Sequence, residues 1–367
     1  MERKLIKMRN SKSLENKIKE TIEKYDLITE GDKIVLGVSG GPDSICMLDF
    51  FYNMMKESKK EDINKKENNN KGVSPWQKIA KRGVPMAIVV AHVNHMIREE
   101  ASEDEEYVRR YCEKNGIEFF SKSIDVKEMA NNNKIGTEEA GRIARYDFFD
   151  EVLKKTNSNK VAIAHNKNDK IETIIMHILR GSGTSGLIGI EPKRDIYIRP
   201  LIECERKDIE NYCEEQRLNP RIDRTNFENV YTRNKIRNIA IPYIQKEFNP
   251  NIIQTIDRLS SMVLEEEKYM EKQVKKIYND ILIDESEKEI ILDLKQFSEQ
   301  EQVIKSRIIR YTITRLLGSS NHIELIHMED IIKLCSKNIG NKYLTPNKNL
   351  KVLVKKGRIY FSHLYNN

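Results

Sequence analysis

The chain has 367 residues, too many for one domain of common size, so we expect at least two domains. Its apolar fraction of 38% supports a packed core, but no apolar run is long enough to span a bilayer, and the charged first residues do not form a secretory signal. Lys and Arg outnumber Asp and Glu by 64 to 57, which permits a polyanionic partner without requiring one, because genome base composition explains the surplus equally well. Five scattered cysteines without a Cys-x-x-Cys pair indicate free thiols in a reducing cytoplasm.

The first two thirds of the chain alternate strand and helix patterns. Hydrophobic periodicity predicts helices over 13–27, 45–55, 103–115, 138–155 (capped by Thr137) and 169–180, and strands over 33–38, 86–91, 117–121 and 161–164. The polar, low-complexity stretch 56–84 is expected to be a surface insertion. Alternation of this kind predicts an α/β domain with a doubly wound parallel sheet, whose ligands bind beyond the carboxyl ends of the strands.

A second domain is expected over 243–367, after a catalytic domain over 1–242. Helical periodicity recurs at 251–276 and 302–317, and a strand pair fits 350–354 and 358–362. The second domain is therefore expected to be mostly helical.

The most informative stretch is the end of the strand at 33–38 and the loop that follows it. This loop has the sequence Ser39-Gly40-Gly41-Pro42-Asp43-Ser44. The glycines let the backbone approach a ligand closely, and the free N–H groups of the next helix, aligned with its dipole, attract a phosphate. Asp43 would repel a phosphate unless a cation bridged them, so it is a candidate Mg²⁺ ligand.

This loop lacks both the Gly-Lys-[Ser/Thr] ending of a Walker P-loop and the Gly-x-Gly-x-x-Gly dinucleotide fingerprint. It resembles the pyrophosphate loop (PP-loop) of the N-type ATP pyrophosphatases, which predicts that Ser39, Gly40, Gly41, Pro42, Asp43 and Ser44 bind ATP. The simpler alternative is a glycine turn with a capping serine.

Polar clusters also follow other strands of the predicted sheet. His92, Asn94 and His95 close one strand, and His165 to Thr173 follow another. A His-x-x-His pair can bind a metal, but no further ligand stands near it in sequence, so hydrogen-bonded histidines at a strand end are the simpler interpretation.

Together, these clusters resemble the tRNA(Ile)-lysidine synthases over residues 34–242. The resemblance rests on the PP-loop, His92-Val93-Asn94-His95, Glu138-Glu139-Ala140-x-Arg142-x-x-Arg145-Tyr146, Arg180-Gly181-Ser182-Gly183, Arg199-Pro200-Leu201, Asp223-x-Thr225-Asn226 and Tyr231-x-Arg233-Asn234-x-Ile236-Arg237. It implies an adenine nucleotide α-hydrolase-like sheet and, in 243–367, a domain that positions tRNA, with the family's further C-terminal domain largely absent.

The resemblance also implies a two-step ligation in the cytoplasm. ATP, with Mg²⁺, adenylylates C2 of the wobble cytidine in the CAU anticodon of tRNA(Ile); free L-lysine then displaces AMP, and the codon read changes from AUG to AUA. No membrane is involved, and the oligomeric state stays open, with a homodimer as one option. The implied catalytic residues are Asp43, Asp169 as base or metal ligand, and Arg199. The residues expected to contact tRNA or substrate are His92, Asn94, His95, Arg145, Arg233, Lys235 and Arg237.

One segment departs from the family pattern. His-His-x-Asp-Asp-Gln-x-Glu-Thr is replaced here by His165-Asn166-Lys167-Asn168-Asp169-Lys170-Ile171-Glu172-Thr173. Asp169 survives as the local carboxylate, and its alternative or additional role is to cap the helix together with Glu172.

Two other functions stay open at the level of sequence. The first is a tRNA thiolase of the same superfamily, which would be expected to bring catalytic or cluster-binding cysteines. The second is a non-catalytic nucleotide- or RNA-binding relative, which the altered segment 165–173 makes conceivable.

Overall fold

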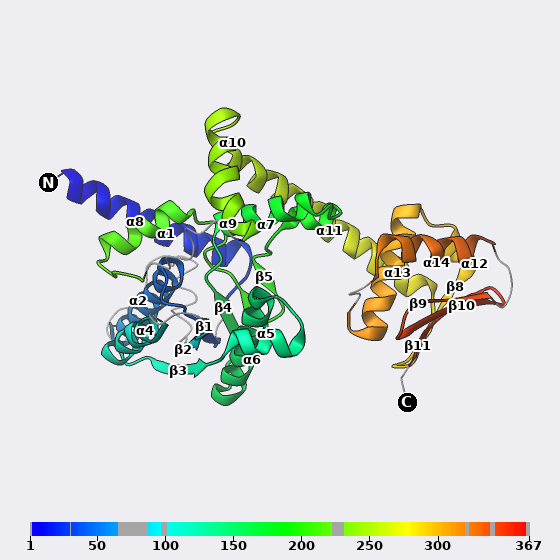
Figure 1. Ribbon diagram of the computed structural model, residues 1–367, viewed down its shortest axis with the longest axis horizontal. Coiled ribbons are helices and arrows are strands. Elements are labelled where there is room, and N and C mark those ends of the chain that lie inside the picture. Colours follow the sequence, from blue (N-terminus) through cyan, green and yellow to red (C-terminus); the bar gives the residue numbers. More distant parts are fainter. Residues whose placement is uncertain are drawn as a thin grey trace. The chain divides into compact units, whose positions relative to one another are not determined.

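The computed structural model describes residues 2–29, 31–64, 87–96, 101–221, 231–319, 323–337 and 342–364, without the side chains of 2–12 and 57–64 (Figure 1). It divides into two compact units, Met1–Ser261 and Met262–Asn367. Each unit has its own sheet and its own hydrophobic core.

In the sheet of the first unit, β1, the strand that leads into the PP-loop, lies near the middle of the strand order. Its strands are β1 (Lys33–Gly37), β2 (Ala87–Asn94), β3 (Glu118–Ser123), β4 (Lys160–Ile163), β5 (Lys193–Arg194) and β6 (Tyr197–Ile198). They lie in the order β3-β2-β1-β4-β6-β5, and all neighbours are parallel except β5 and β6. The chain winds from β1 outward through β2 to β3 and then returns to β4 on the other side of β1. The strand order therefore reverses between β1 and β4, where open α/β sheets bind their ligands.

The helices of the first unit are α1 (Glu2–Lys24), α2 (Pro42–Asn64), α4 (Ala101–Asn115), α5 (Val126–Asn133), α6 (Thr137–Thr156), α7 (Lys167–Leu179), α8 (Arg206–Glu215), α9 (Thr232–Lys235), α10 (Ile241–Glu247) and the start of α11 (Ile252–Ile281), with the short turns η1 (Thr184–Ile188) and η3 (Ile236–Ala240). Helices α1, α2, α4 and α8 pack in one core with Ile34 and Leu36 of β1. Helix α6 packs on the opposite face, against Val35. Because both faces of β1 are covered, its apolar run is continuous, and the predicted doubly wound sheet is confirmed.

Several predicted boundaries differ from the observed ones. Helix α2 runs to Asn64, so the first part of the expected insertion 56–84 is helical, and 65–84 lie outside the described residues. Thr137 is the first residue of α6 rather than its cap, which is Gly136. Among the described helices, none combines the length and the apolar character needed to cross a membrane.

The second unit contains more strand than the sequence predicted. The expected strand pair forms β10 (Leu350–Lys355) and β11 (Arg358–His363), and β7 (Leu282–Glu285), β8 (Glu289–Asp293) and β9 (Lys342–Asn347) complete an antiparallel sheet in the order β7-β8-β11-β10-β9. Helices α12 (Leu294–Ser298), α13 (Gln302–Leu317) and α14 (Leu325–Lys337) share a core with one face of this sheet.

The division between the units falls later than the expected boundary at 242/243. Ile253, in the first turn of α11, belongs to an apolar cluster with Ile171 of α7. The Ser260 hydroxyl donates to the carbonyl of Ile188 at 2.9 Å. The first part of α11 is therefore part of the first unit.

Candidate active site

The PP-loop leaves the carboxyl end of β1 and enters α2 at Pro42. Gly40 adopts a φ of +93°, which a residue with a side chain rarely adopts, so this position requires glycine. The carbonyl of Gly40 accepts from the backbone N–H of Arg221 at 3.0 Å. The N–H groups of Asp43 and Ser44 lie in the first turn of α2 and have no acceptor within the helix, as a phosphate site requires.

The side chain of Ser44 holds the loop in shape. Its Oγ accepts from the backbone N–H of Ser39 at 3.1 Å and of Gly40 at 3.2 Å, and it donates to the Gly41 carbonyl at 3.0 Å. The Ser39 hydroxyl lies 3.2 Å from the same oxygen. The structure thus gives Ser44 a part in the fold of the loop, next to the ATP contact proposed from the sequence.

Asn166 connects the PP-loop to the neighbouring strand β4. It is the N-cap of α7, with no exposed surface, and it forms a capping box with Asp169: its Oδ1 accepts from the Asp169 N–H, and its own N–H donates to Asp169 Oδ2. Its Nδ2 donates to Asp43 Oδ1 at 2.8 Å. One residue therefore holds both acids, Asp43 through its side-chain amide and Asp169 through its backbone N–H, and the cap is Asn166 rather than Asp169 as the sequence suggested.

The two acids have opposite pKa shifts. Burial, and then the nearby charge of Asp169, raise the pKa of Asp43 to about 6. Burial also pushes the pKa of Asp169 upward, but Arg233, His165 and Arg206 outweigh it and leave that pKa below its usual value. Asp169 is thus an ionised carboxylate and a poor proton acceptor, which argues against its role as base.

Three arginines converge on Asp169 and Glu172. The Nη2 atoms of Arg206, Arg233 and Arg237 lie 3.3, 3.4 and 3.1 Å from Asp169 Oδ1. Glu172, only 1% exposed, accepts from Arg233 Nε at 2.9 Å and from Arg237 Nε at 2.6 Å. Three guanidinium groups against two carboxylates give this cluster a net positive charge, which suits a phosphate ligand.

His165 and Arg199 form a second pair at the strand ends. Arg199, 6% exposed, donates through Nε to His165 Nδ1 at 3.2 Å and through Nη1 to the Glu191 carbonyl at 2.7 Å. Burial lowers the pKa of His165 to about 4; Asp169 opposes this shift and Arg199 adds to it. His165 is therefore a neutral acceptor at neutral pH.

The remaining expected residues lie around this centre in different settings. His92 donates from Nδ1 to the Val38 carbonyl at 2.8 Å, and Asn94 donates to Glu105 at 3.4 Å. The buried Nδ1 of His95 has no partner in the described part of the chain, and burial lowers the pKa of His95 to about 4.

On the helices beside them, Arg145 is exposed and donates from Nε to the Gly141 carbonyl at 3.3 Å, and Lys235 is exposed. The family segment Asp223-x-Thr225-Asn226 lies outside the described residues.

Every residue that departs from the family pattern in 165–173 has a specific partner. Asn166 holds Asp43, and Asn168 Oδ1 accepts from the Arg206 N–H at 3.0 Å. The buried Lys170 Nζ lies 2.9 Å from Asp257 Oδ1, and Lys167 Nζ lies 2.9 Å from the other oxygen. The altered residues are therefore built into the site.

The acids fit a magnesium ion bound together with a nucleotide. Within the described residues, no three His, Cys, Asp or Glu side chains are placed to hold a metal ion. Asp43 and Asp169, however, are both held by Asn166, one by its side-chain amide and the other by its backbone N–H, and their mutual repulsion would be relieved by a cation. Mg²⁺ commonly takes one or two carboxylates and completes its octahedron with phosphate oxygens and water.

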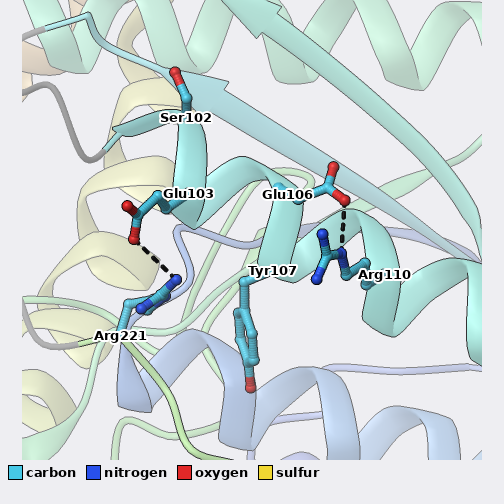
Figure 2. A pocket seen from close by; sticks show the side chains of 6 residues that line it. All are labelled: Ser102, Glu103, Glu106, Tyr107, Arg110 and Arg221. Atoms are coloured by element: carbon cyan, nitrogen blue, oxygen red, sulfur yellow. Dashed lines mark hydrogen bonds and ion pairs between the residues drawn. The ribbon is translucent and has the colours of Figure 1, made fainter.

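An open hollow of about 350 Å³ is lined by α4 and by Arg221, the residue whose backbone N–H donates to the Gly40 carbonyl (Figure 2). Five of its lining residues, Ser102, Glu103, Glu106, Tyr107 and Arg110, come from α4, and the sixth is Arg221. In Figure 2, Glu103 meets Arg221 at 3.1 Å and Glu106 meets Arg110 at 2.6 Å. Its charges are paired with one another, and it contains none of the residues predicted from the sequence.

Comparisons with known proteins agree with this arrangement. Residues 10–244 match the family model of the PP-loop domain. A tRNA(Ile)-lysidine synthase from Clostridium acetobutylicum is 43% identical over 346 residues, which cover 94% of this chain and 69% of the relative. The chain belongs to the tRNA(Ile)-lysidine synthase family. Another member, from Clostridioides difficile, is 40% identical over 95% of this chain and 70% of its own length.

The family's fold extends to a protein of different chemistry. The U34-tRNA thiolase of Methanococcus maripaludis, solved with its [4Fe-4S] cluster, covers 70% of this chain and 80% of its own, with a TM-score of 0.53 and 18% identity, which shows a shared fold alone. All five cysteines of this lysidine synthase family member are free and buried, and the described residues contain no metal-binding group of three. The thiolase alternative thus lacks a cysteine site.

Sequence reasoning missed three members of the site. Arg206 and Asp257 act on residues far away in the chain, and no local motif marks them. Asn166 was noted only as a departure from the family pattern. A signal for the lysines did exist: Lys167 and Lys170 open a helix beside a sheet edge, where two cations need an acid.

Proposed function

We propose that this protein ligates free L-lysine to C2 of the wobble cytidine in the CAU anticodon of tRNA(Ile), using ATP and releasing AMP and diphosphate. The modified anticodon reads AUA instead of AUG. Since tRNA, ATP and free lysine meet in the cytoplasm, we place the protein there. The observation that best supports this function is the hydrogen bond between Asn166 and Asp43, which joins the PP-loop to the acids and arginines that follow β4.

In the first step, the cytidine O2 attacks the α-phosphate of ATP and diphosphate leaves. The first-turn N–H groups of α2 would bind phosphate oxygens, and the cluster of Arg206, Arg233 and Arg237 would stabilise the charge that develops on them. Mg²⁺, held by Asp43 and Asp169, would neutralise phosphate charge.

In the second step, the lysine ε-ammonium loses a proton to water and the resulting amine attacks C2. The bond between C2 and the adenylate oxygen breaks, AMP leaves, and the proton released from the new C–N bond also passes to water. Asp169 supports this step through its negative charge. It binds the three guanidinium groups, and the ammonium group of the lysine substrate would compete with them for it before losing its proton. Arg199 fixes His165 as a neutral acceptor at the same edge of the sheet. His92, Asn94, His95, Arg145 and Lys235 are assigned to the tRNA side of the site.

The test is incorporation of labelled lysine into a tRNA(Ile) transcript in the presence of ATP and Mg²⁺. We expect one AMP for each lysine attached, and no label in a transcript whose wobble cytidine is replaced by uridine. AMP release without label in the RNA would point to a different nucleophile. Tight nucleotide binding without any AMP would identify a non-catalytic relative.

A further inference from the structure

The start of α11 forms a buried ionic triad with α7. The two carboxylate oxygens of Asp257 each lie 2.9 Å from a lysine Nζ, one from Lys167 and the other from Lys170, and all three residues are buried. Burial raises the pKa of Asp257, but the charges of the two lysines outweigh it and leave that pKa below its usual value. The acid is therefore ionised and serves as the counterion of both lysines.

Each lysine of this triad directly follows a residue of the candidate active site. Lys167 follows Asn166, which holds Asp43. Lys170 follows Asp169, which meets three guanidinium groups. Residues three apart lie on one face of a helix, so the lysines share the side of α7 that contacts α11, and Asn166 and Asp169 share the neighbouring side. A shift of α7 along α11 therefore displaces the residues of the site by the same amount.

The same part of α11 also reaches α8. Gln254 lies three residues before Asp257, and its Nε2 donates to Glu205 Oε1 at 3.1 Å. Glu205 is the N-cap of α8 and precedes Arg206, whose Nη2 lies 3.3 Å from Asp169 Oδ1. Two neighbouring side chains of α11 thus contact both helices that carry the ion pair between Asp169 and Arg206.

Apolar contacts hold α7 against α11 but do not set its position along that helix. Ile171 of α7 and Ile253 of α11 belong to one apolar cluster, and the hydrophobic effect is not directional. The triad differs, because a displacement by one residue of helical rise, about 1.5 Å, would separate buried lysines from their counterion. Buried ion pairs are poor stabilisers, but they can specify register. A misplacement of about 1 Å can lower the rate of a reaction about 100-fold.

We propose that Asp257 is a positioning residue for the first step, in which the cytidine O2 attacks the α-phosphate of ATP and diphosphate leaves. Through the two lysines it fixes α7 at the place where Asn166 can hold Asp43. This inference rests on the proposed function, because that function supplies the step. Asp257 acts through the lysines and not on ATP, so its loss should slow the step and leave the affinity for ATP nearly unchanged.

The test compares Asp257→Asn with the matched control Asp32→Asn. Asp32 is also buried and lies 2.6 Å from a lysine, Lys160, but this pair lies at the amino ends of β1 and β4, away from the site at their carboxyl ends. Both substitutions remove the charge of a buried acid, so a general loss of stability affects both variants.

The measurements are single-turnover diphosphate release with ATP and a tRNA(Ile) transcript, and the dissociation constant for ATP, each well below the melting temperature of the variant. Asp257→Asn should lower the rate about 10- to 100-fold with little change in ATP affinity, and Asp32→Asn should keep the parent rate. Equal rates in the two variants would overturn the positioning role.

A triple variant removes the ions without leaving a charge unpaired. Lys167→Met, Lys170→Met and Asp257→Leu together replace the triad by apolar side chains, an exchange that often leaves stability unchanged or raises it. This variant should melt near the parent and still release diphosphate slowly, because the apolar contacts do not set the register. It also carries the comparison if Asp257→Asn does not fold. A triple variant with the melting temperature and the rate of the parent would reduce the triad to a structural contact.

Two further results separate this proposal from the proposed function. A parent that releases diphosphate but attaches no lysine would defeat the proposed ligation and leave the rate comparison valid. If the parent releases no diphosphate, crystal structures of parent and triple variant decide. The distance from Asn166 Nδ2 to Asp43 Oδ1, 2.8 Å in the parent, should exceed about 3.5 Å in the variant, and an unchanged distance would contradict the proposal.

Discussion

Asn166 has two separable roles in the candidate active site, and two substitutions distinguish them. Ser keeps an oxygen for the Asp169 N–H but cannot reach Asp43 with a donor, so Asn166→Ser should retain stability and lower AMP formation about 10- to 100-fold. Asn166→Ala removes both bonds and should cost about 1 kcal/mol of stability as well. Thermal unfolding and a single-turnover AMP assay measure the two effects. Full activity in the Ser variant would mean that Asp43 needs no support from Asn166.

The structure changes the expected effect of replacing Asp169 on stability. As an N-cap it could be exchanged for Asn at no cost, but it lies at N3, where three guanidinium groups meet its Oδ1. Removing the charge leaves them facing Glu172 alone. Asp169→Asn should therefore lower the free energy of unfolding by about 3 kcal/mol, the low end for a broken buried pair, because the arginine side chains stay 19–27% exposed. Urea denaturation measures this, and an unchanged midpoint would show that the arginines do not depend on Asp169.

Residues with a local signal were predictable, and those that depend on distant partners were not. Asp43 and the glycines of the loop could be predicted because they lie between a strand pattern and a helix pattern. Arg206 lies 37 residues from Asp169, and Asp257 lies 87 residues from Lys170. Nothing in the neighbouring sequence of either residue records such a contact.

At the level of elements, α7 is fixed to α11 by buried charges. Asp257 accepts from Lys167 and Lys170. Asp257→Asn therefore leaves two buried cations without a counterion, whereas Lys170→Gln leaves one ion pair intact. We expect the first change to destabilise by about 3–5 kcal/mol and the second by less. The double variant should be more stable than the sum of the single effects, which a double-mutant cycle in urea measures. Strict additivity would show that the lysines find other partners.

The sequence predicted the elements whose pattern is strong, such as β1 with its continuous apolar run. It missed β7, β8 and β9. For the two edge strands the reason is that such strands bury little: three of the four residues of β7 are exposed, and β9 has no buried residue. An apolar alternation is the signal for a strand, and these strands do not need one.

For the whole molecule, the division after Ser261 predicts where the chain can be cut. A chain ending at 242 lacks Ile253, Asp257 and Ser260, all of which contact the first unit, and should melt well below the parent. A chain ending at 264 keeps these contacts, and it should fold, bind ATP like the parent and bind tRNA more weakly. Calorimetry and nucleotide titration of the two fragments check this. Equal melting temperatures would place the boundary at 242.

The ion pairs of Asp257 also constrain how the sequence of this protein can evolve. A mutation that restores glutamine at Lys170, as in the family pattern, leaves Asp257 with Lys167 alone, and loss of Asp257 first leaves two buried lysines without a counterion. Either single step passes through a weakened protein, so each position limits which residues the other can accept. The effect of a substitution at position 170 thus depends on the residue at position 257, and the same change can have different costs in different genetic backgrounds.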